Sequence, residues 1–395
     1  MTTVAAAAFA DELARLDLAS LSAYAESAPA ADVDRALQRE HLDLRGLAAL
    51  LSPAAADRLE DVAQRAAALT AQRFGRAVRL FAPLYVSNEC LSTCTYCGFA
   101  KPLAVRRRTL SPDEAVAEAR VLTARGFRHL LLVAGEHRLA VSSDYLVDVV
   151  SRLAPFVPSI AVETQTWSDD TYARLVAAGV EGVVHYQETY DRTRYAAVHI
   201  AGWKRDFDRR LASTERAAEA GVRRLGIGAL LGLATDWRAD VLAVAAHAAF
   251  LARRYWRTEV TVALPRIKPS ASGYQPVEPV GDRHYAQALA ALRLAVPDAG
   301  IVLSTREPAA LRDGLLRIAV THMSAGSSTE PGGYAHPGES QEQFAVSDTR
   351  SPAEVATAIV TAGFDPVWKD AFPLAAPLSP DRVKGQERGR SKTRA

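Results

Sequence analysis

The sequence predicts an α/β protein: a (β/α)8 barrel of TIM type with a helical N-terminal extension and a short C-terminal extension. Three observations carry this prediction. Eight short apolar runs follow one another from Leu84 onward, and each ends in a polar or Gly-containing turn. Amphipathic stretches separate the runs, and the residues before Leu80 carry only helical patterns. Eight strand–helix units are the number that closes a parallel sheet on itself.

The apolar runs are mostly rich in Val, Ile and Leu, so we expect them as buried parallel strands. The run that begins at Leu84 would be the first strand of the barrel. The expected strands are Leu84–Ser87, His129–Ala134, Ser159–Glu163, Gly182–Gln187, Arg224–Leu230, Glu259–Pro265, Gly300–Thr305 and Ala319–Ser324.

Capping residues predict where the helices begin. Ser111 and Ser168 each precede acidic residues, the pattern of an N-cap followed by a favourable first turn. The last barrel helix is expected from Ser351 to Gly363. In the N-terminal region the patterns predict helices over Phe9–Leu16 and Pro53–Phe74.

Three regions are expected along the chain. Residues 1–80 form a helical N-terminal region, residues 81–370 form the barrel, and residues 371–395 form a C-terminal tail. The last residues of the tail are polar and basic without an apolar period, which predicts disorder there.

Composition excludes several classes of protein. The formal net charge is +2 from 47 basic and 45 acidic residues, so no overall field favours nucleic acid or an anionic membrane. No apolar run approaches the roughly 20 residues that span a bilayer. The Ala-rich start lacks the basic segment of a secretion signal, and cysteine is confined to one tight group. The cytoplasm is therefore the expected compartment.

The most informative segment follows the first expected strand. Cys90, Cys94 and Cys97 are the only cysteines of the chain and form the pattern C-x3-C-x2-C. Three thiolates from one loop can hold three corners of a 4Fe–4S cluster and leave the fourth iron open. An open iron can bind the amino and carboxylate groups of S-adenosylmethionine, and Tyr96, just before the last cysteine, suits a place beside the adenine.

A zinc site is the main alternative. Structural zinc usually takes four protein ligands, often from two C-x2-C halves, and a second half is missing here. His129 or His137 could supply a fourth ligand. Three buried cysteines without any metal are the remaining alternative.

Polar residues at the other strand ends should surround the cysteines, because chemistry in such barrels occurs where the strands end. Gly135 and Glu136 follow the second strand and suit binding of an ammonium group. Glu163 ends the third strand and could face the barrel mouth to hold a ribose or an amine. Glu188 follows the fourth strand. For Glu136 the alternative is a solvated loop acid.

Two arginines end later strands, Arg266 after the sixth and Arg306 after the seventh. An arginine in that position can clamp a carboxylate through two parallel hydrogen bonds, and Ser324 at the end of the eighth strand could add to the same site. The alternative for Arg306 is a salt bridge with Glu307 or another nearby acid. The run Arg106–Arg108 is expected as a solvated face that could also cover the mouth.

The sequence segments around these residues resemble those of a known family. It is similar to the aromatic amino acid lyase branch of the radical S-adenosylmethionine enzymes, and within it to the 2-iminoacetate synthases, the tyrosine lyases of thiamine thiazole biosynthesis. The similar segments are LYVSNECLSTCTYCGF (84–99), GEH (135–137), YQETY (186–190), DFDRRL (206–211), GIGALLGL (226–233), PRIKP (265–269), LSTREP (303–308), SAGSSTEPGGY (324–334) and VWKD (367–370).

The resemblance implies a specific reaction. Enzymes of this family remove a hydrogen atom from the amine of L-tyrosine with a deoxyadenosyl radical, and the Cα–Cβ bond then breaks to give 2-iminoacetate and p-cresol. By resemblance, Arg306 and Ser324 bind the amino acid carboxylate, and Glu136 and Arg210 hold the methionine part of S-adenosylmethionine. Implied partners are a flavodoxin- or ferredoxin-type electron donor and thiazole synthase.

Two relatives of the branch are weighed against this reading. The hydrogenase-maturation tyrosine lyase carries a second cluster on C-terminal cysteines, and no cysteine follows Cys97 here. The tryptophan lyases share the barrel and the arginine. The segment PRIKPSASGYQP departs from the usual text of the thiamine enzymes, so a lyase acting on tryptophan or another aromatic amino acid in a natural-product pathway is the alternative.

Overall fold

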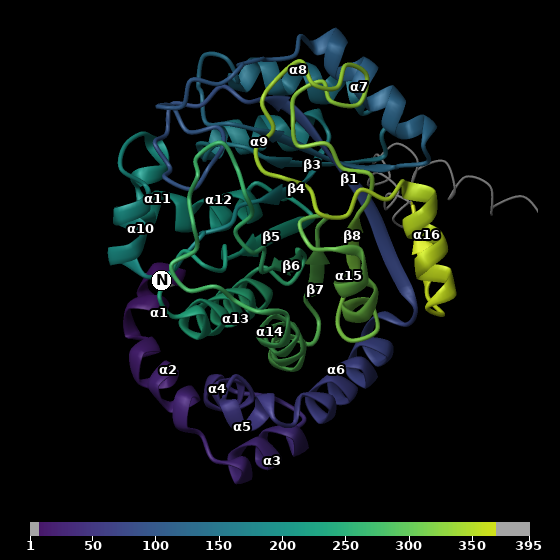
Figure 1. Cartoon of the computed structure of the whole chain (residues 1–395). Coiled ribbons are helices and arrows are strands. Elements are labelled where there is room, and N and C mark those ends of the chain that lie inside the picture. Colours follow the sequence, from purple (N-terminus) through teal and green to yellow (C-terminus); the bar gives the residue numbers. More distant parts are fainter. Residues whose placement is uncertain (1–7, 369–395) are drawn as a thin grey trace, which may run out of the picture.

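The structure is a computed structural model that describes residues 8–368. Its centre is a parallel sheet with the strand order β2-β3-β4-β5-β6-β7-β8-β1-β9, closed by the pairing of β1 with β2. The predicted eight-stranded barrel is therefore confirmed, and Figure 1 shows it ringed by helices. The strands are β1 (Ala77–Ser87), β2 (His129–Ala134), β3 (Ser159–Glu163), β4 (Val180–Val184), β5 (Arg224–Gly228), β6 (Glu259–Ala263), β7 (Gly300–Leu303), β8 (His322–Ser324) and β9 (Asp365–Val367).

Strand β1 is longer than predicted. It begins at Ala77 and not at Leu84, because Arg79, Leu80 and Phe81 pair with the whole of β8. The N-terminal end of β1 also pairs with β9, a short strand outside the barrel that the sequence analysis missed. The early part of β1 alternates between exposed and buried residues, so it lacks the continuous apolar run of a central strand.

Helices cover the outside of the barrel. Ser111 and Ser168 cap α7 and α9 as predicted, and Ser351 caps the last helix, α16. Each of these serine hydroxyls accepts the backbone N–H of the third residue after it. The helices are α7 (Pro112–Ala124), α8 (Ser143–Leu153), α9 (Asp169–Ala178), α10 (Arg192–Val198), α11 (Phe207–Leu211), α12 (Ser213–Glu219), α13 (Trp237–Arg254), α14 (Asp282–Ala295), α15 (Ala309–Leu316) and α16 (Pro352–Thr361), with a 3-10 turn, η1, at Trp203–Arg205.

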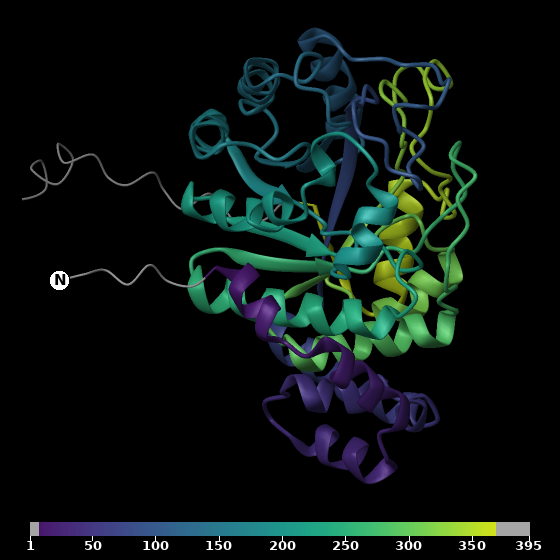
Figure 2. The same ribbon diagram turned by 90° about the vertical axis from the view of Figure 1, so that its left-hand side faces the viewer.

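The N-terminal region consists of six helices that pack on α13 and α14 along one side of the barrel (Figures 1 and 2). Phe9 anchors the first of them, since its ring stacks on His247 of α13 with centroids 4.1 Å apart. The single helix predicted over Pro53–Phe74 is wrong, because Arg58 leaves the helical conformation and pairs with Asp34 and Asp61. The helices are α1 (Phe9–Arg15), α2 (Leu18–Ser27), α3 (Ala30–Gln38), α4 (Leu44–Leu50), α5 (Pro53–Ala56) and α6 (Leu59–Phe74).

The carboxyl ends of the strands gather on one side of the barrel, to the right in Figure 2. The long connections after β1 and after β8 both lie over this mouth and contact each other there. A Cβ at Gly98 would collide with the backbone oxygen of Gln343, so glycine permits the close approach of these two loops. Within residues 8–368, no helix is long and apolar enough to cross a membrane. The predicted C-terminal tail, 371–395, lies outside the described residues.

Candidate active site

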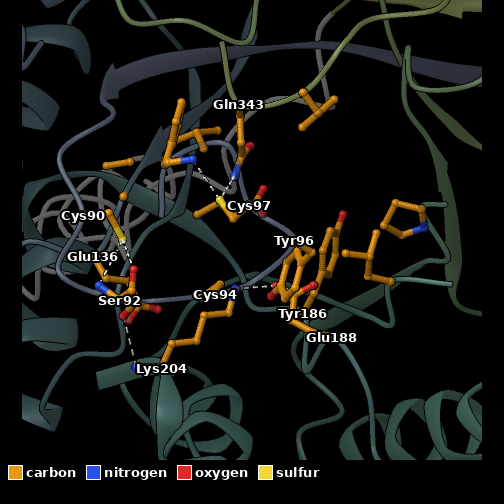
Figure 3. A pocket seen from close by; sticks show the side chains of 18 of the residues that line it. Cys90, Ser92, Cys94, Tyr96, Cys97, Glu136, Tyr186, Glu188, Lys204 and Gln343 are labelled. Atoms are coloured by element: carbon orange, nitrogen blue, oxygen red, sulfur yellow. Dashed lines mark hydrogen bonds and ion pairs between the residues drawn. The ribbon is translucent and has the colours of Figure 1, made fainter. Parts of the chain in front are cut away.

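The three cysteines lie on the loop after β1 and line one cavity at the barrel mouth (Figure 3). All three are free thiols. The loop is held from behind by Asn88, whose side chain donates to the Arg106 carbonyl at 2.8 Å and accepts the Arg108 N–H at 2.7 Å. Arg107 adds four hydrogen bonds to backbone carbonyls of the loop. The expectation of a solvated Arg106–Arg108 face is therefore wrong for Arg107, which organises the cysteine loop.

The surroundings of the cysteines suit an iron–sulfur cluster. The Ser92 N–H donates to Cys90 Sγ and the Phe99 N–H to Cys97 Sγ, each at 3.4 Å, as hydrogen bonds to cluster sulfurs do. Burial raises the pKa of the Cys90 thiol to about 11, so a thiolate there needs a cation to compensate it. A Cβ at Gly135 would lie 3.0 Å from Cys90 Cβ, so this glycine lets the β2 loop approach the cysteine loop.

The structure does not support the alternative of a zinc site. Within the described part of the chain, no three His, Cys, Asp or Glu side chains are gathered closely enough to hold a single metal ion. His129 lies at the beginning of β2, whereas the cysteines follow the end of the parallel strand β1, so they occupy opposite ends of the barrel. His137 accepts the Ala140 N–H within its own loop.

A buried network of four charges forms one wall of the cysteine-lined cavity. Arg210 of α11 lies 3.1 Å from Glu136 and 3.6 Å from Glu188. Lys204 of η1 lies 2.6 Å from Glu188. Burial alone would raise the pKa of Glu188, but Lys204 and Arg210 together hold it below its usual value. Glu188 is therefore ionised, and the cationic and anionic groups of the network face the same cavity.

Tyr96 lies on the same cavity wall. Its hydroxyl donates to Nε2 of His199 at 2.9 Å, because Nδ1 of that ring is committed to the Tyr195 carbonyl. Burial lowers the pKa of His199 to about 3, so the ring is neutral and can accept this hydrogen bond. The aromatic face of Tyr96 is thereby fixed beside the cysteines.

A second cavity continues from the first toward the inside of the barrel. Glu163, Tyr186 and Arg306 line both cavities, and Gln343 and Phe344 of the loop after β8 cover them. The first encloses about 910 Å³ and the second about 660 Å³, open solvent included. Of the predicted site residues, Ser324 lines the second cavity together with Arg306, the candidate Arg266 lines neither, and the others line the first.

Among the described residues, Arg306 makes no ion pair with a carboxylate, although its charge acts on nearby Glu163. Within residues 8–368 its guanidinium group makes no ion pair and lies over the Phe344 ring, 3.3 Å from the centroid. Glu307 binds Arg266 at 3.1 Å and Lys268 at 3.5 Å, so the predicted alternative of an Arg306–Glu307 salt bridge is wrong. Arg266 forms ion pairs with Glu307 and with Asp282. Of the described cations that line the cavity, Arg306 is therefore the one without an ion pair.

Two charged or polar side chains of the site escaped the sequence analysis. Lys204 belongs to a short turn between helices that carried no motif of its own. Gln343 lies far along the chain, donates to Cys97 Sγ at 3.8 Å and accepts the Tyr85 hydroxyl at 2.7 Å. Nothing in the local pattern around Gln343 could have indicated this contact.

Comparisons with known proteins identify the family. The model of the Radical SAM superfamily matches residues 84–244, and that of the Biotin and Thiamin Synthesis associated domain matches residues 263–365. The 2-iminoacetate synthases of Salmonella typhimurium and Escherichia coli are each 41% identical to this chain over 362 residues, which is 92% of this chain and 96% of theirs.

Solved structures agree. A crystal structure of HydG, a maturase of the FeFe-hydrogenase, matches with a TM-score of 0.83 and 30% identity, over 89% of this chain and 79% of that chain. HydG from Carboxydothermus hydrogenoformans also gives 0.83, with 31% identity over 91% of this chain and 84% of that chain. Methylornithine synthase shares the fold, with a TM-score of 0.68 and 19% identity over 85% of this chain and 97% of that chain.

The resemblance inferred from the sequence is thereby confirmed, as are the enzyme class and its two cofactors. The residues assigned to those cofactors remain predictions, which the cavity geometry supports. The chain belongs to the 2-iminoacetate synthase family of the radical S-adenosylmethionine superfamily, whose members use a 4Fe–4S cluster and S-adenosylmethionine.

Proposed function

We propose that the chain is a lyase that cleaves the Cα–Cβ bond of L-tyrosine to 2-iminoacetate and p-cresol, with 5′-deoxyadenosine and methionine as co-products. The observation that carries this proposal is the unpaired guanidinium group of Arg306 in a cavity continuous with the cysteines. An amino acid substrate brings the carboxylate that this cation lacks.

In the proposed site, Cys90, Cys94 and Cys97 hold the cluster. When bound, the cluster and S-adenosylmethionine supply the 5′-deoxyadenosyl radical. Glu136 and Glu188 offer carboxylates to the cofactor's ammonium group and hydroxyls, and Arg210 offers a cation to its carboxylate. Gly135 leaves room for close approach, and Tyr96 lies beside the adenine. These assignments match the cofactor's ammonium group and its carboxylate with opposite charges on the wall.

The substrate would bind across the boundary of the two cavities. Its carboxylate pairs with Arg306 and the Ser324 hydroxyl, and Glu163 lies near its amine. With the radical supplied, the tyrosine amine would lose a hydrogen atom to it, and scission of the Cα–Cβ bond would follow. The leaving 4-hydroxybenzyl fragment is a stabilised radical, which would take an electron from the external reductant and a proton from solvent to become p-cresol. The second cavity suits the ring, since Phe81, Tyr85 and Tyr186 line it.

The partners follow from this chemistry. We infer a flavodoxin- or ferredoxin-type electron donor, because each cleavage of S-adenosylmethionine consumes one electron. 2-Iminoacetate hydrolyses readily in water, so transfer to thiazole synthase is the proposed fate in thiamine biosynthesis. A low-potential cluster with an open iron needs a reducing compartment, for which we infer the cytoplasm.

Product analysis tests the proposal. Anaerobically reconstituted enzyme with dithionite, S-adenosylmethionine and tyrosine should yield p-cresol, 5′-deoxyadenosine and glyoxylate from hydrolysed 2-iminoacetate. Phenylalanine should react poorly, because a cavity that binds the phenol hydroxyl leaves its polar partners unsatisfied with this substrate. Absence of p-cresol, together with an indole product from tryptophan, would refute the tyrosine assignment.

A further inference from the structure

We propose that a basic and aromatic surface behind the cysteine loop is the docking site for a small acidic electron-carrier protein of the ferredoxin type. This proposal rests on the proposed function only in that the cluster must receive an electron. We call it the donor patch, and it consists of Arg138, Leu139, Ile200, Trp203, Arg205 and Arg209.

The donor patch is built on a segment that lies directly against the cysteine loop. The Thr93 N–H donates to the Ala201 carbonyl at 2.9 Å, and the Thr95 N–H donates to the Val198 carbonyl at 3.0 Å. A Cβ at Gly202 would lie 2.5 Å from the Ser92 Cα, so the two backbones are in contact there. Ser92, Thr93 and Thr95 flank Cys94. The patch is thus one layer of backbone away from a cysteine predicted to bind the cluster.

Side chains of the turn η1 alternate between the inside and the outside. Lys204 points inward to Glu188, and Figure 3 shows it beside Ser92 and Cys94. Its neighbours Trp203 and Arg205 are exposed, and 41% of the Trp203 surface is accessible. The turn therefore connects the buried cavity wall with the outer surface over a single residue.

The patch carries three arginine side chains, and the acid beside them, Asp206, caps α11 by accepting the Arg209 N–H. The Arg138 guanidinium carbon lies 3.0 Å from the centroid of the Trp203 ring, and that of Arg209 lies 4.2 Å from it. Partial burial, and after it the nearby charge of Arg209, lower the pKa of Arg138. In the part of the chain described, neither of these arginines nor Arg205 forms an ion pair. Such a local field attracts an acidic partner and speeds its encounter.

Exposed apolar side chains accompany these cations along the chain. Leu139, which follows Arg138, is 87% exposed, and Ile200, three residues before Trp203, is 59% exposed. Exposed apolar residues grouped among polar ones mark an interaction site. Electron-transfer complexes are short-lived and bury less than about 1,200 Å², so their docking surfaces need not be large. The three arginines of the patch complement the negative charge of a small acidic iron–sulfur carrier, and its three apolar side chains supply contact surface.

The chain offers a matched control on the opposite end of the barrel. Trp256 is 76% exposed, and the Arg257 guanidinium carbon lies 5.0 Å from its ring centroid. These two residues stand between α13 and the beginning of β6, away from the carboxyl ends of the strands. They reproduce the exposed tryptophan–arginine pair without the proximity to the cysteine loop.

The experiment compares two reductants on the reconstituted holoenzyme, with 5′-deoxyadenosine as the product measured. With a reduced 4Fe–4S ferredoxin, the double variant R138E/R205E and the variant W203S should each lose at least tenfold in rate. With dithionite, each should stay within twofold of the unaltered enzyme, which also shows that the variants fold and hold iron. The control variants R257E and W256S should match the unaltered enzyme with both reductants. Raising the salt from 0.05 to 0.5 M should slow only the ferredoxin reaction.

Three outcomes would overturn the proposal. Donor-patch variants that keep the full ferredoxin rate would place docking elsewhere, and an equal loss with dithionite would make the patch structural. Turnover supported by reduced flavodoxin and not by ferredoxin would assign a different carrier. Because 5′-deoxyadenosine is measured, failure to form p-cresol would refute the tyrosine assignment and leave the docking result intact.

Discussion

The Nζ atom of Lys204 lies 2.6 Å from Oε1 of Glu188, on the wall of the cavity that the three cysteines line. Glu188 has a backbone φ of 72°, the only positive value at a non-glycine residue within the described residues. Such a conformation costs about 1–3 kcal/mol and persists where the surroundings enforce it. The strained backbone thus directs a carboxylate toward a lysine and an arginine at the predicted cofactor site.

Replacing this lysine should weaken cofactor binding. In K204M, Glu188 keeps only the longer contact with Arg210, so a buried carboxylate loses its best partner. We expect the KM for S-adenosylmethionine to rise by roughly thirtyfold, or about 2 kcal/mol. K204R should restore most of the affinity because it keeps the cation. An unchanged KM in K204M would show that the pair only supports the fold.

Each cysteine should be indispensable. The variants C90A, C94A and C97A remove one of three thiolates that line the cavity, so iron content and cleavage of S-adenosylmethionine should both collapse. Iron analysis and the visible spectrum after anaerobic reconstitution measure this. T93A is the matched control, since Thr93 lies on the same loop and its hydroxyl makes only a 3.3 Å hydrogen bond to Ala201. Full iron content in any cysteine variant would place the cluster elsewhere.

Asp240 should make the fold less stable as the pH rises. It is 2% exposed, and burial raises its pKa to about 7, although it accepts hydrogen bonds from the Tyr190 N–H and the Thr189 hydroxyl. A carboxyl group with a raised pKa holds its proton in the folded state and releases it in the unfolded state. The free energy of unfolding should therefore fall between about pH 4 and pH 7, by on the order of 4 kcal/mol.

The variant D240N tests this pH dependence. Its amide stays neutral and can still accept the Tyr190 N–H, so its urea midpoint should change less between pH 5 and pH 8 than that of the unaltered protein. Equal slopes in both proteins would show that Asp240 does not titrate in this range. The control is D298N, because Asp298 is exposed and the structure gives it only a 3.4 Å contact with Arg73.

The sequence predicted the barrel because buried parallel strands leave a direct pattern. The strands β2 and β3 agree with the predicted ranges residue for residue, since polar residues bound both apolar runs. The early part of β1 was missed because Arg79 and Phe81 face a mixed environment near β8 and β9. Propensity along the chain carries no information about such neighbours.

Site residues were predictable where a strand end carries a distinctive side chain, as with Glu136 and Arg306. Lys204 and Gln343 reach the cavity from a short turn and a long loop, whose paths depend on packing across the barrel mouth. Whether Arg306 lacks an ion pair also depends on tertiary contacts. Glu307 could have paired with either arginine, and in the structure it pairs with Arg266. Sequence proximity suggested the Arg306–Glu307 pair only as an alternative, and the structure does not form it.

Arg306 provides the sharpest test of substrate binding. Its guanidinium group is held over Phe344 without a carboxylate partner, so a bound amino acid would supply the first one. In R306K the positive charge remains, but lysine lacks the planar fork that binds both carboxylate oxygens. The loss should be about 2–4 kcal/mol in transition-state terms, a decrease in kcat/KM for tyrosine of roughly thirty- to a thousandfold.

The two half-reactions separate this role from a structural one. Cleavage of S-adenosylmethionine without tyrosine should survive in R306K, because the four charged residues of the cofactor wall are untouched. F344L serves as the control, since it removes the aromatic ring and keeps the cation that would bind the carboxylate. If R306K formed p-cresol at the normal rate, the carboxylate would have to bind elsewhere. Arg266 could then take that role only by giving up Glu307, which would appear as a loss of stability in the substrate-free enzyme.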